Sequence, residues 1–201
     1  MHSRAARLVL LFLFVGALTT TAYLFWKSEA LASSQAAAAS AFDASARAAQ
    51  RALLDVRSDQ RGYVSAGQGG DFWAAKVAQN LDAVRRSLAA LRASSLSPQA
   101  QSLIDEVVGL LDDFGKADKR AVEYTRRDQR LLASDVIFED GFDLTEGALV
   151  SLEHARAAEL SMRAAAMDEA RRRGVFAVVA GAGAASLAVL LLLPVPPTRR
   201  V

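Results

Sequence analysis

The sequence predicts an all-α protein, a membrane-anchored up-down-up-down four-helix bundle whose first and last helices continue into two transmembrane helices. Two uncharged apolar runs, residues 8–26 and 174–195, are each long enough to cross a bilayer, which takes roughly 20 residues as a helix. Between them, apolar residues recur at alternating spacings of four and three, the pattern of a coiled-coil-like seam. Only four of the 201 residues are Pro, and no alternating strand pattern competes.

The two runs divide the chain into five parts. We expect a basic tail over 1–7, a transmembrane helix over 8–26, the bundle over 27–173, a second transmembrane helix over 174–195 and a short tail over 196–201. Tyr23 and Trp26 end the first run, where amphipathic aromatic side chains settle at the head-group level. A cleaved signal peptide is the alternative for the first run, but its apolar stretch exceeds the usual 7–15 residues.

Flanking charges predict the orientation in the membrane. Arg4 and Arg7 favour a cytoplasmic N-terminus, which places the bundle on the periplasmic or extracellular side of a bacterial inner membrane. The run 171–173 is three Arg, and it opposes this orientation because it would lie on the outer side of the second span. Long loops translocate largely regardless of charge, so we follow the N-terminal signal.

Four amphipathic helices account for the middle of the chain, over about 27–66, 71–94, 98–125 and 130–173. The predicted seam residues are Phe42, Ala46, Ala49, Leu53, Val56, Gln60 and Tyr63; Val77, Leu81, Val84, Leu88 and Leu91; Leu103, Val107, Leu110, Phe114, Ala117, Ala121 and Tyr124; and Phe138, Phe142, Thr145, Leu149 and Leu152.

Three turns separate these helices. Residues 66–70 contain three Gly, which break a helix. Ser97 and Pro98 form an N-cap followed by Pro at the first helical position. The third turn has no such signature, and we place it within 124–130 so that the first and last helices reach equal heights. A turn at Gly141 would leave the last helix too short, so Gly141 becomes a weak point inside that helix.

Residues 54–67, with the sequence LDVRSDQRGYVSAG, resemble the most recognisable stretch of the CHASE3 family. An acidic residue and a Gln-Arg-Gly-Tyr run close the first helix there, and Asp71, Phe72 and Trp73 after the turn are also similar. The resemblance covers about residues 50–95. It implies an extracytoplasmic four-helix sensor domain of a bacterial signalling receptor. Other four-helix ligand-binding modules of chemoreceptors share the general pattern.

Arg57, Asp59, Gln60, Arg61 and Tyr63 are the candidate ligand-binding residues. Arg57 and Arg61 lie four apart on one helix face, where like charges repel unless an anion or a carboxylate lies between them. Gln60 falls in the seam and needs hydrogen-bond partners when buried. The group could form an anion or small-solute site. The alternative, which we favour, is an interhelical polar network that fixes the register of the bundle.

We expect surface or packing roles for three other groups of residues. Glu139, Asp140, Asp143 and Glu146 lack the spacing of a dedicated cation loop, and we expect a solvated face or pairing to Arg on the first helix. His154 has no second ligand nearby, so we expect no metal site and place it on the surface. In the second span, small residues recur every four positions, at Ala177, Gly181 and Ala185, as in helices that pack closely.

These observations predict a sensor rather than an enzyme. No nucleophile–base pair or phosphate loop can be assembled, so we expect no catalysis and no cofactor. A net charge of +2 without a basic stripe argues against nucleic acid. About six residues follow the second span, so we expect a homodimer in the bilayer that signals through a histidine kinase or chemoreceptor-type partner, or that is the sensor half of a receptor. The alternative is a structural or adaptor protein whose bundle binds another protein without sensing a ligand.

Overall fold

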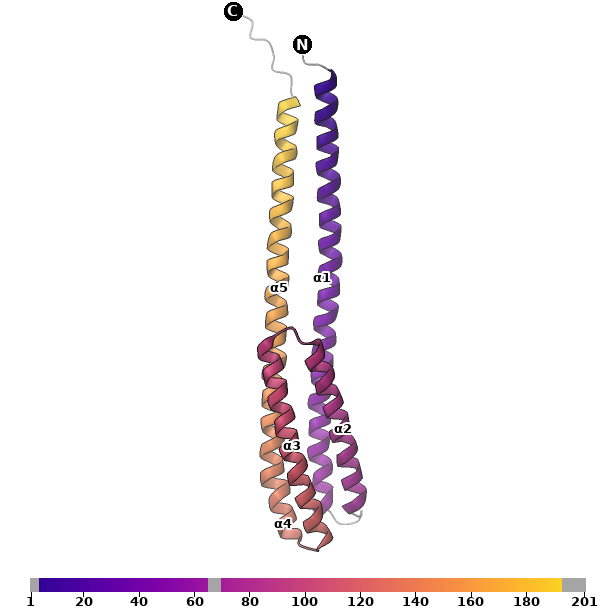
Figure 1. Cartoon of the computed structure of the whole chain (residues 1–201), viewed down its shortest axis with the longest axis vertical. Coiled ribbons are helices and arrows are strands. Elements are labelled where there is room, and N and C mark those ends of the chain that lie inside the picture. The colour runs from indigo at the N-terminus through magenta and orange to yellow at the C-terminus, as the bar shows by residue number, and fades with distance from the viewer. Residues whose placement is uncertain (1–3, 65–69, 193–201) are drawn as a thin grey trace, which may run out of the picture. The chain divides into compact units, whose positions relative to one another are not determined.

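A computed structural model describes the backbone of residues 4–64 and 70–192 (Figure 1), and the side chains of these residues except 4–11, 13, 184–185 and 187–192. The chain divides into two compact units, which we describe separately. The bundle unit comprises residues 37–163. The paired-helix unit comprises residues 1–36 and 164–201.

The described residues form helices joined by short turns, which confirms the all-α prediction. The long helices are α1 (Arg4–Gln60), α2 (Gly70–Ser94), α3 (Pro98–Arg126) and α5 (Gly141–Leu192). A short 3₁₀ helix, η1 (Arg61–Val64), follows α1. A short helix, α4 (Arg130–Asp135), leads through a π-helix, η2 (Val136–Asp140), into α5. The predicted turn at 66–70 falls almost wholly on residues outside the described part of the chain.

Local chemistry explains the two described turns. Ser97 caps α3 by accepting a hydrogen bond from the backbone N–H of Ala100 at 3.3 Å, with Pro98 at the start of the helix. The α3–α4 turn lies inside the predicted range 124–130. It has no Gly, and Asp128 takes the left-handed conformation instead, with φ of 58°. At Gly141 the chain does not turn, because a π-helix joins α4 to α5 there.

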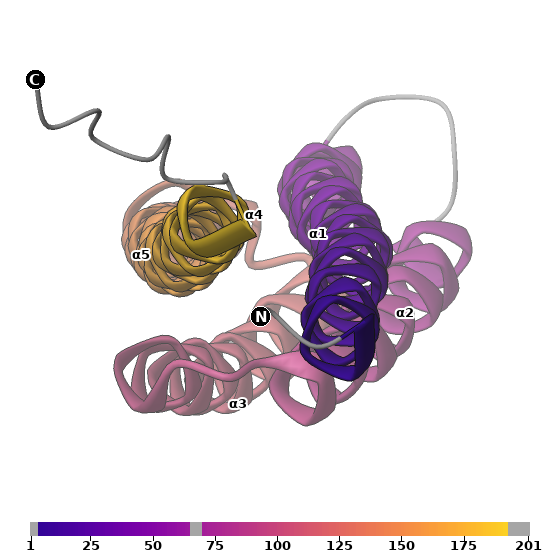
Figure 2. The same cartoon turned by 90° about the horizontal axis from the view of Figure 1, so that it is seen from above.

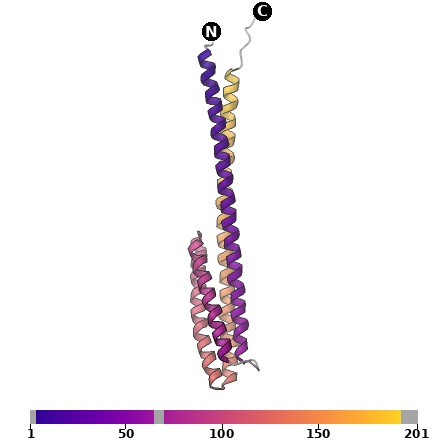
Figure 3. The same ribbon diagram turned by 90° about the vertical axis from the view of Figure 1, so that its right-hand side faces the viewer.

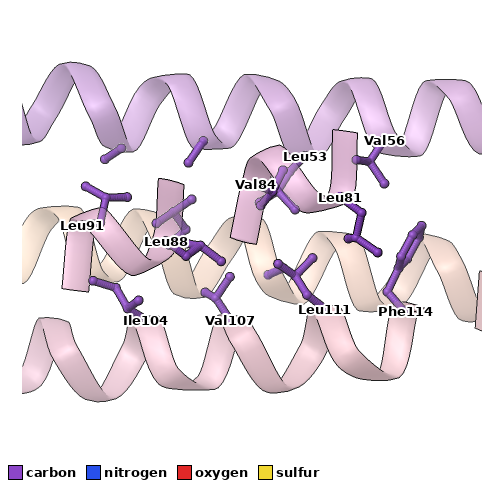
Figure 4. Close-up of a cluster of buried hydrophobic side chains, with 14 of the residues drawn as sticks. Leu53, Val56, Leu81, Val84, Leu88, Leu91, Ile104, Val107, Leu111 and Phe114 are labelled. Atoms are coloured by element: carbon purple, nitrogen blue, oxygen red, sulfur yellow. The ribbon is translucent and has the colours of Figure 1, made fainter. Parts of the chain in front are cut away.

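The bundle unit has a single apolar core enclosed by α1, α2, α3 and α5 (Figures 2 and 3). The predicted seams of its first two helices are confirmed, since every residue in them is buried. Figure 4 shows the apolar side chains of α1, α2 and α3 pointing toward one another, among them Leu53, Leu88, Ile104 and Phe114.

The predicted seams of the last two helices need correction. On α3 the predicted Val107, Phe114, Ala117 and Ala121 are buried. Ile104 and Leu111 are buried in place of Leu103 and Leu110, a shift of one residue, and the predicted Tyr124 is only half-buried. On η2 and α5, Phe138 and Phe142 are exposed and Leu149 is half-buried. The buried residues of η2 and α5 are Ile137, Gly141, Thr145, Ala148, Ser151, Leu152, Ala155, Glu159 and Arg163, and Ala133 is buried on α4. A π-helix holds one more residue per turn than an α-helix, so a uniform heptad cannot be extended across η2.

Within the paired-helix unit, α1 and α5 run antiparallel and approach closely at one point (Figures 1 and 3). A Cβ on Gly181 would lie 2.7 Å from Thr21 Oγ1, a hydroxyl that itself donates to Ala17 O at 2.8 Å. Ala177 is exposed, and the side chain of Ala185 lies outside the described residues. Of the predicted small-residue stripe, the described contact is therefore that of Gly181.

Within the described residues, no helix is long and apolar enough to cross a membrane.

Candidate functional site

The five predicted ligand-binding residues point toward different helices of the bundle unit. Asp59 is buried and accepts hydrogen bonds from Lys76 Nζ at 2.8 Å and from Asn80 Nδ2 at 2.7 Å, both on α2. Arg57 faces α5, where its guanidinium lies 3.2 Å from Glu146 Oε2 and 4.2 Å from the ring centre of Phe142. These two charges therefore belong to two separate helix–helix contacts.

Gln60 and Tyr63 converge on one carboxylate of α3. Gln60 Nε2 donates to Asp118 Oδ1 at 3.1 Å, and the Tyr63 hydroxyl donates to the same oxygen at 2.9 Å. Gln60 and Tyr63 are both buried, so these bonds supply the partners that a buried amide and phenol need. Arg61 is exposed. The predicted interhelical polar network is present at this end of the bundle.

The amide oxygen of Gln60 lies against Gly141, the first residue after the π-helix. A Cβ at position 141 would collide with this oxygen, so any larger residue would force the buried Gln60 side chain to shift. Thr145 continues the polar layer, since its buried hydroxyl donates to Gly141 O at 2.8 Å. π-Helices often mark functional sites because they re-aim the residues beside them.

The polar layer shifts the ionisation of two of its members. Burial raises the pKa of Asp118 above its usual value, and the hydrogen bonds from Tyr63 and Gln60 only partly oppose that change. Burial and the neighbouring Asp118 together raise the pKa of Tyr63, so its hydroxyl remains a hydrogen-bond donor. The layer is therefore a set of neutral donors arranged around a carboxyl group.

A small cavity of about 120 Å³ adjoins this layer and is lined by Tyr63, Gly70, Asp71, Val122, Thr125 and Arg126. A more open hollow of about 390 Å³ lies beside it and shares Val122 and Arg126. Of the five predicted residues, only Tyr63 reaches the cavity. Arg126 supplies a guanidinium, already 2.9 Å from Asp71 Oδ1, and Thr125 donates its hydroxyl to Ala121 O. The space fits a polar molecule of a few heavy atoms.

A second polar network, at the α2–α3 loop, was not predicted. Glu159 of α5 is fully buried and accepts hydrogen bonds from Ser95 Oγ at 2.7 Å, Ser97 N at 2.8 Å and Leu96 N at 3.0 Å. Arg163, also buried, donates to Glu159 at 2.7 Å and to the backbone oxygen of Ser94 at 2.8 Å. One ion pair on α5 thus bonds the backbone N–H groups of Leu96 and Ser97 and the carbonyl oxygen of Ser94.

Ionisation of Glu159 follows from these contacts. Burial alone would raise its pKa, but the hydrogen bonds from Leu96, Ser95, Ser97 and Arg163 outweigh burial and hold the pKa below its usual value. A sequence signal did exist. Continuing the spacing of four and three from Leu152 reaches Arg156, Glu159 and Arg163, so three charged residues occupy seam positions. In the structure Glu159 and Arg163 are buried and Arg156 is half-buried.

The remaining predicted clusters are surface features. In the acidic group, Glu146 pairs with Arg57 of α1, as expected, whereas Asp140 pairs with Arg120 Nη2 of α3 at 2.8 Å instead of with α1. His154 is exposed, as predicted. Among the described residues, no group of three or more His, Cys, Asp or Glu could hold a metal ion.

Comparisons with known proteins add no relative to this geometry. No family model, no curated protein and no solved structure matches the chain.

Proposed function

We propose that this chain is a two-pass bacterial inner-membrane protein whose bundle unit is a CHASE3-like sensor domain outside the cytoplasm. In this proposal residues 8–26 and 174–195 are the membrane anchors. The protein has no catalytic activity of its own and acts on a signalling partner such as a histidine kinase or a chemoreceptor. It works as a homodimer in the bilayer.

The observation that carries the anchoring proposal is the register of α1 against α5. On α1 the charge-free stretch ends between Trp26 and Lys27, and on α5 it begins between Arg173 and Gly174. With Thr21 against Gly181 in antiparallel helices, position 26 lies level with position 176. At 1.5 Å per residue, the two boundaries fall within about 3 Å of one level. A bilayer surface demands such a common level, which two unrelated apolar stretches have no reason to share.

Exposed aromatic side chains at this level support the same proposal. Tyr23, Phe25 and Trp26 of α1 are 57%, 62% and 71% exposed, and Phe176 of α5 is 80% exposed. Aromatic rings are enriched where the hydrocarbon core meets the head groups. In water, four neighbouring exposed aromatic rings would be costly, whereas in a bilayer they act as anchors.

The sensing proposal rests on helix continuity and on the polar layer. Helices α1 and α5 each contain residues of both units without a break in the helix. The cavity beside Tyr63 and Arg126 is lined by residues of η1, α2 and α3, and a small polar ligand bound there can bias the polar layer through Tyr63. One observation favours the adaptor alternative: the buried polar side chains Asp59, Gln60 and Tyr63 already have hydrogen-bond partners on α2 and α3.

Cysteine labelling tests the anchoring, because the native chain has no Cys. We expect a membrane-impermeant maleimide to label Ser58→Cys, on the exposed surface of the bundle unit, in intact spheroplasts. Ser3→Cys is the matched position in the N-terminal tail, and it should react only after lysis. Equal labelling of both sites, or recovery of the chain in the soluble fraction, would overturn the proposal.

Ligand-dependent stabilisation tests sensing. The full chain in detergent micelles is heated with a panel of small polar metabolites, and a ligand at 100 times its Kd adds about 2.7 kcal/mol of stability. The shift should vanish in Val122→Trp, which fills the cavity, and persist in Gly109→Trp, whose added side chain meets open space on the same helix. A shift that survives Val122→Trp places the ligand elsewhere, and no shift with any compound favours the adaptor.

A further inference from the structure

We infer that Lys27 and Arg171, Arg172 and Arg173 form a cationic collar that binds the head groups of anionic phospholipids. This inference rests on the proposed membrane anchoring and goes beyond it, because it names the lipid class that the anchor recognises. The collar lies entirely in the paired-helix unit.

The register at Gly181 places the four cations in one band. Lys27 is six residues beyond Thr21 on α1, a rise of about 9 Å. The three Arg lie eight to ten residues before Gly181 on α5, a rise of about 12–15 Å in the same direction. The exposed rings of Trp26 and Phe176 lie about 7.5 Å from the same reference contact. The cations therefore follow the aromatic belt directly, at the depth where phosphate groups lie.

The cations of the band are accessible and exceed the acids beside them. Arg173 is 79% exposed and pairs with Glu169 at 2.8 Å, while Arg171 and Arg172 are exposed and make no ion pair within the described part of the chain. Residues 27–31 and 169–173 carry four cations against two acids, Glu29 and Glu169, and Asp168 follows one residue further. The net excess of positive charge near the belt attracts anionic head groups.

Guanidinium groups suit phosphate because their fork of N–H donors binds two oxygens at once. Each cation at an anionic surface strengthens binding by about fivefold, so a net excess of two charges enriches anionic lipid by at most about 25-fold. Lipid binding also accounts for three consecutive Arg on the side of the second span that topology rules disfavour. Those rules concern translocation of the chain, whereas the collar acts on lipid once the chain is inserted.

Quenching by brominated lipid tests the inference on the full chain. Trp73→Phe leaves Trp26 as the single Trp, next to the collar. The protein is reconstituted in mixed phosphatidylcholine and phosphatidylglycerol bilayers in which one or the other lipid is brominated. The ratio of the two quenching efficiencies measures how far phosphatidylglycerol is enriched around Trp26.

We expect several-fold enrichment of phosphatidylglycerol that falls as NaCl is raised, because salt screens exposed charges. It should drop to the bulk ratio in Arg171→Gln/Arg172→Gln/Arg173→Gln and largely persist when the same three residues become Lys. The charge-matched control changes Lys116, Arg127 and Arg130 of the bundle unit to Gln, three exposed side chains, and should leave the enrichment unchanged.

The two proposals fail in different ways. If neither brominated lipid quenches Trp26, the chain is not in the bilayer and the anchoring proposal is wrong. If both lipids quench in the bulk ratio, the anchoring stands and the collar is refuted. Enrichment that survives removal of the three Arg also refutes the collar.

Discussion

Replacing Glu159 by Gln tests whether the buried ion pair on α5 holds the α2–α3 loop. The change keeps the shape of the side chain but removes its charge, and it leaves the buried guanidinium of Arg163 without its counter-ion. Removing one partner of a buried pair costs about 3–5 kcal/mol, a large part of a typical stability of about 5–15 kcal/mol. The backbone N–H groups of Leu96 and Ser97 also lose a charged acceptor.

Thermal unfolding of the full chain, followed by far-UV circular dichroism in detergent micelles, measures the effect. We expect Glu159→Gln to lower Tm by about 10–20 °C, from a few degrees per kcal/mol for a unit of this size. Asp105→Asn is the control. It breaks the ion pair between Arg92 Nε and Asp105 Oδ1, which lie 2.5 Å apart on two half-exposed side chains. Tm should change far less, because water solvates both charges.

The double variant Glu159→Leu/Arg163→Leu separates the ion pair from the rest of the network. It removes both buried charges, so it should cost less than the sum of the two single changes. The pH dependence gives a further check. Because the folded pKa of Glu159 is lowered, its contribution is complete above the unfolded value of about 4.3 and is lost as the pH falls through the lower folded value. Glu159→Gln lacks that contribution at every pH.

Two results would refute this reasoning. One is a Tm for Glu159→Gln no lower than that of the Asp105→Asn control. The other is strict additivity of the Glu159 and Arg163 substitutions, which would mean that the two side chains do not act as a pair.

Three further predictions concern single positions. Gly141→Ala should destabilise the bundle by about 1–3 kcal/mol, because the added Cβ meets the buried amide of Gln60. Gly109→Ala should stabilise it by about 0.4–1 kcal/mol, because the added Cβ meets open space. Urea unfolding measures both, and equal effects would contradict the prediction. Asp118→Asn should raise Tm at neutral pH. The raised pKa of Asp118 means that the native protein loses stability as the pH rises through that pKa, and Asn removes this loss. The gain in Tm should therefore shrink toward about pH 3.9, and a gain that is constant with pH would contradict the prediction. Gly181→Leu should lower Tm in micelles by overpacking α1 against α5, while Gly183→Leu, with nothing within 4 Å, should not.

Periodicity predicted the core of the first two bundle helices because their seams are regular. The same method failed at Phe138 and Phe142, which were expected in the core and are exposed. A π-helix changes the register by one residue, and no residue type marks it in the sequence. Small residues such as Gly141 occupy the seam after it, because there α5 packs closely against Gln60.

The candidate site was likewise predictable from the sequence only in part. A seam position predicted that Gln60 would be buried and need partners, and both are observed. Its partner Asp118 could not be predicted, because it lies 58 residues away on another helix. Glu159 falls at a seam position, so the sequence indicated that it could be buried. Its role at the α2–α3 loop could not be predicted, because the sequence does not show which groups it bonds to.

The sequence by itself determined the all-α class, two apolar stretches of membrane length, and the core faces of α1 and α2, because hydrophobic periodicity and segment length are local properties. Only the tertiary structure decided how the polar residues are used. Asp59, Gln60 and Arg57 diverge to three helices, Glu159 closes the α2–α3 loop, and Gly181 sets the register of α1 against α5. Hydrogen bonds and close contacts depend on the positions of groups far apart in the chain, and those positions exist only once the helices have packed.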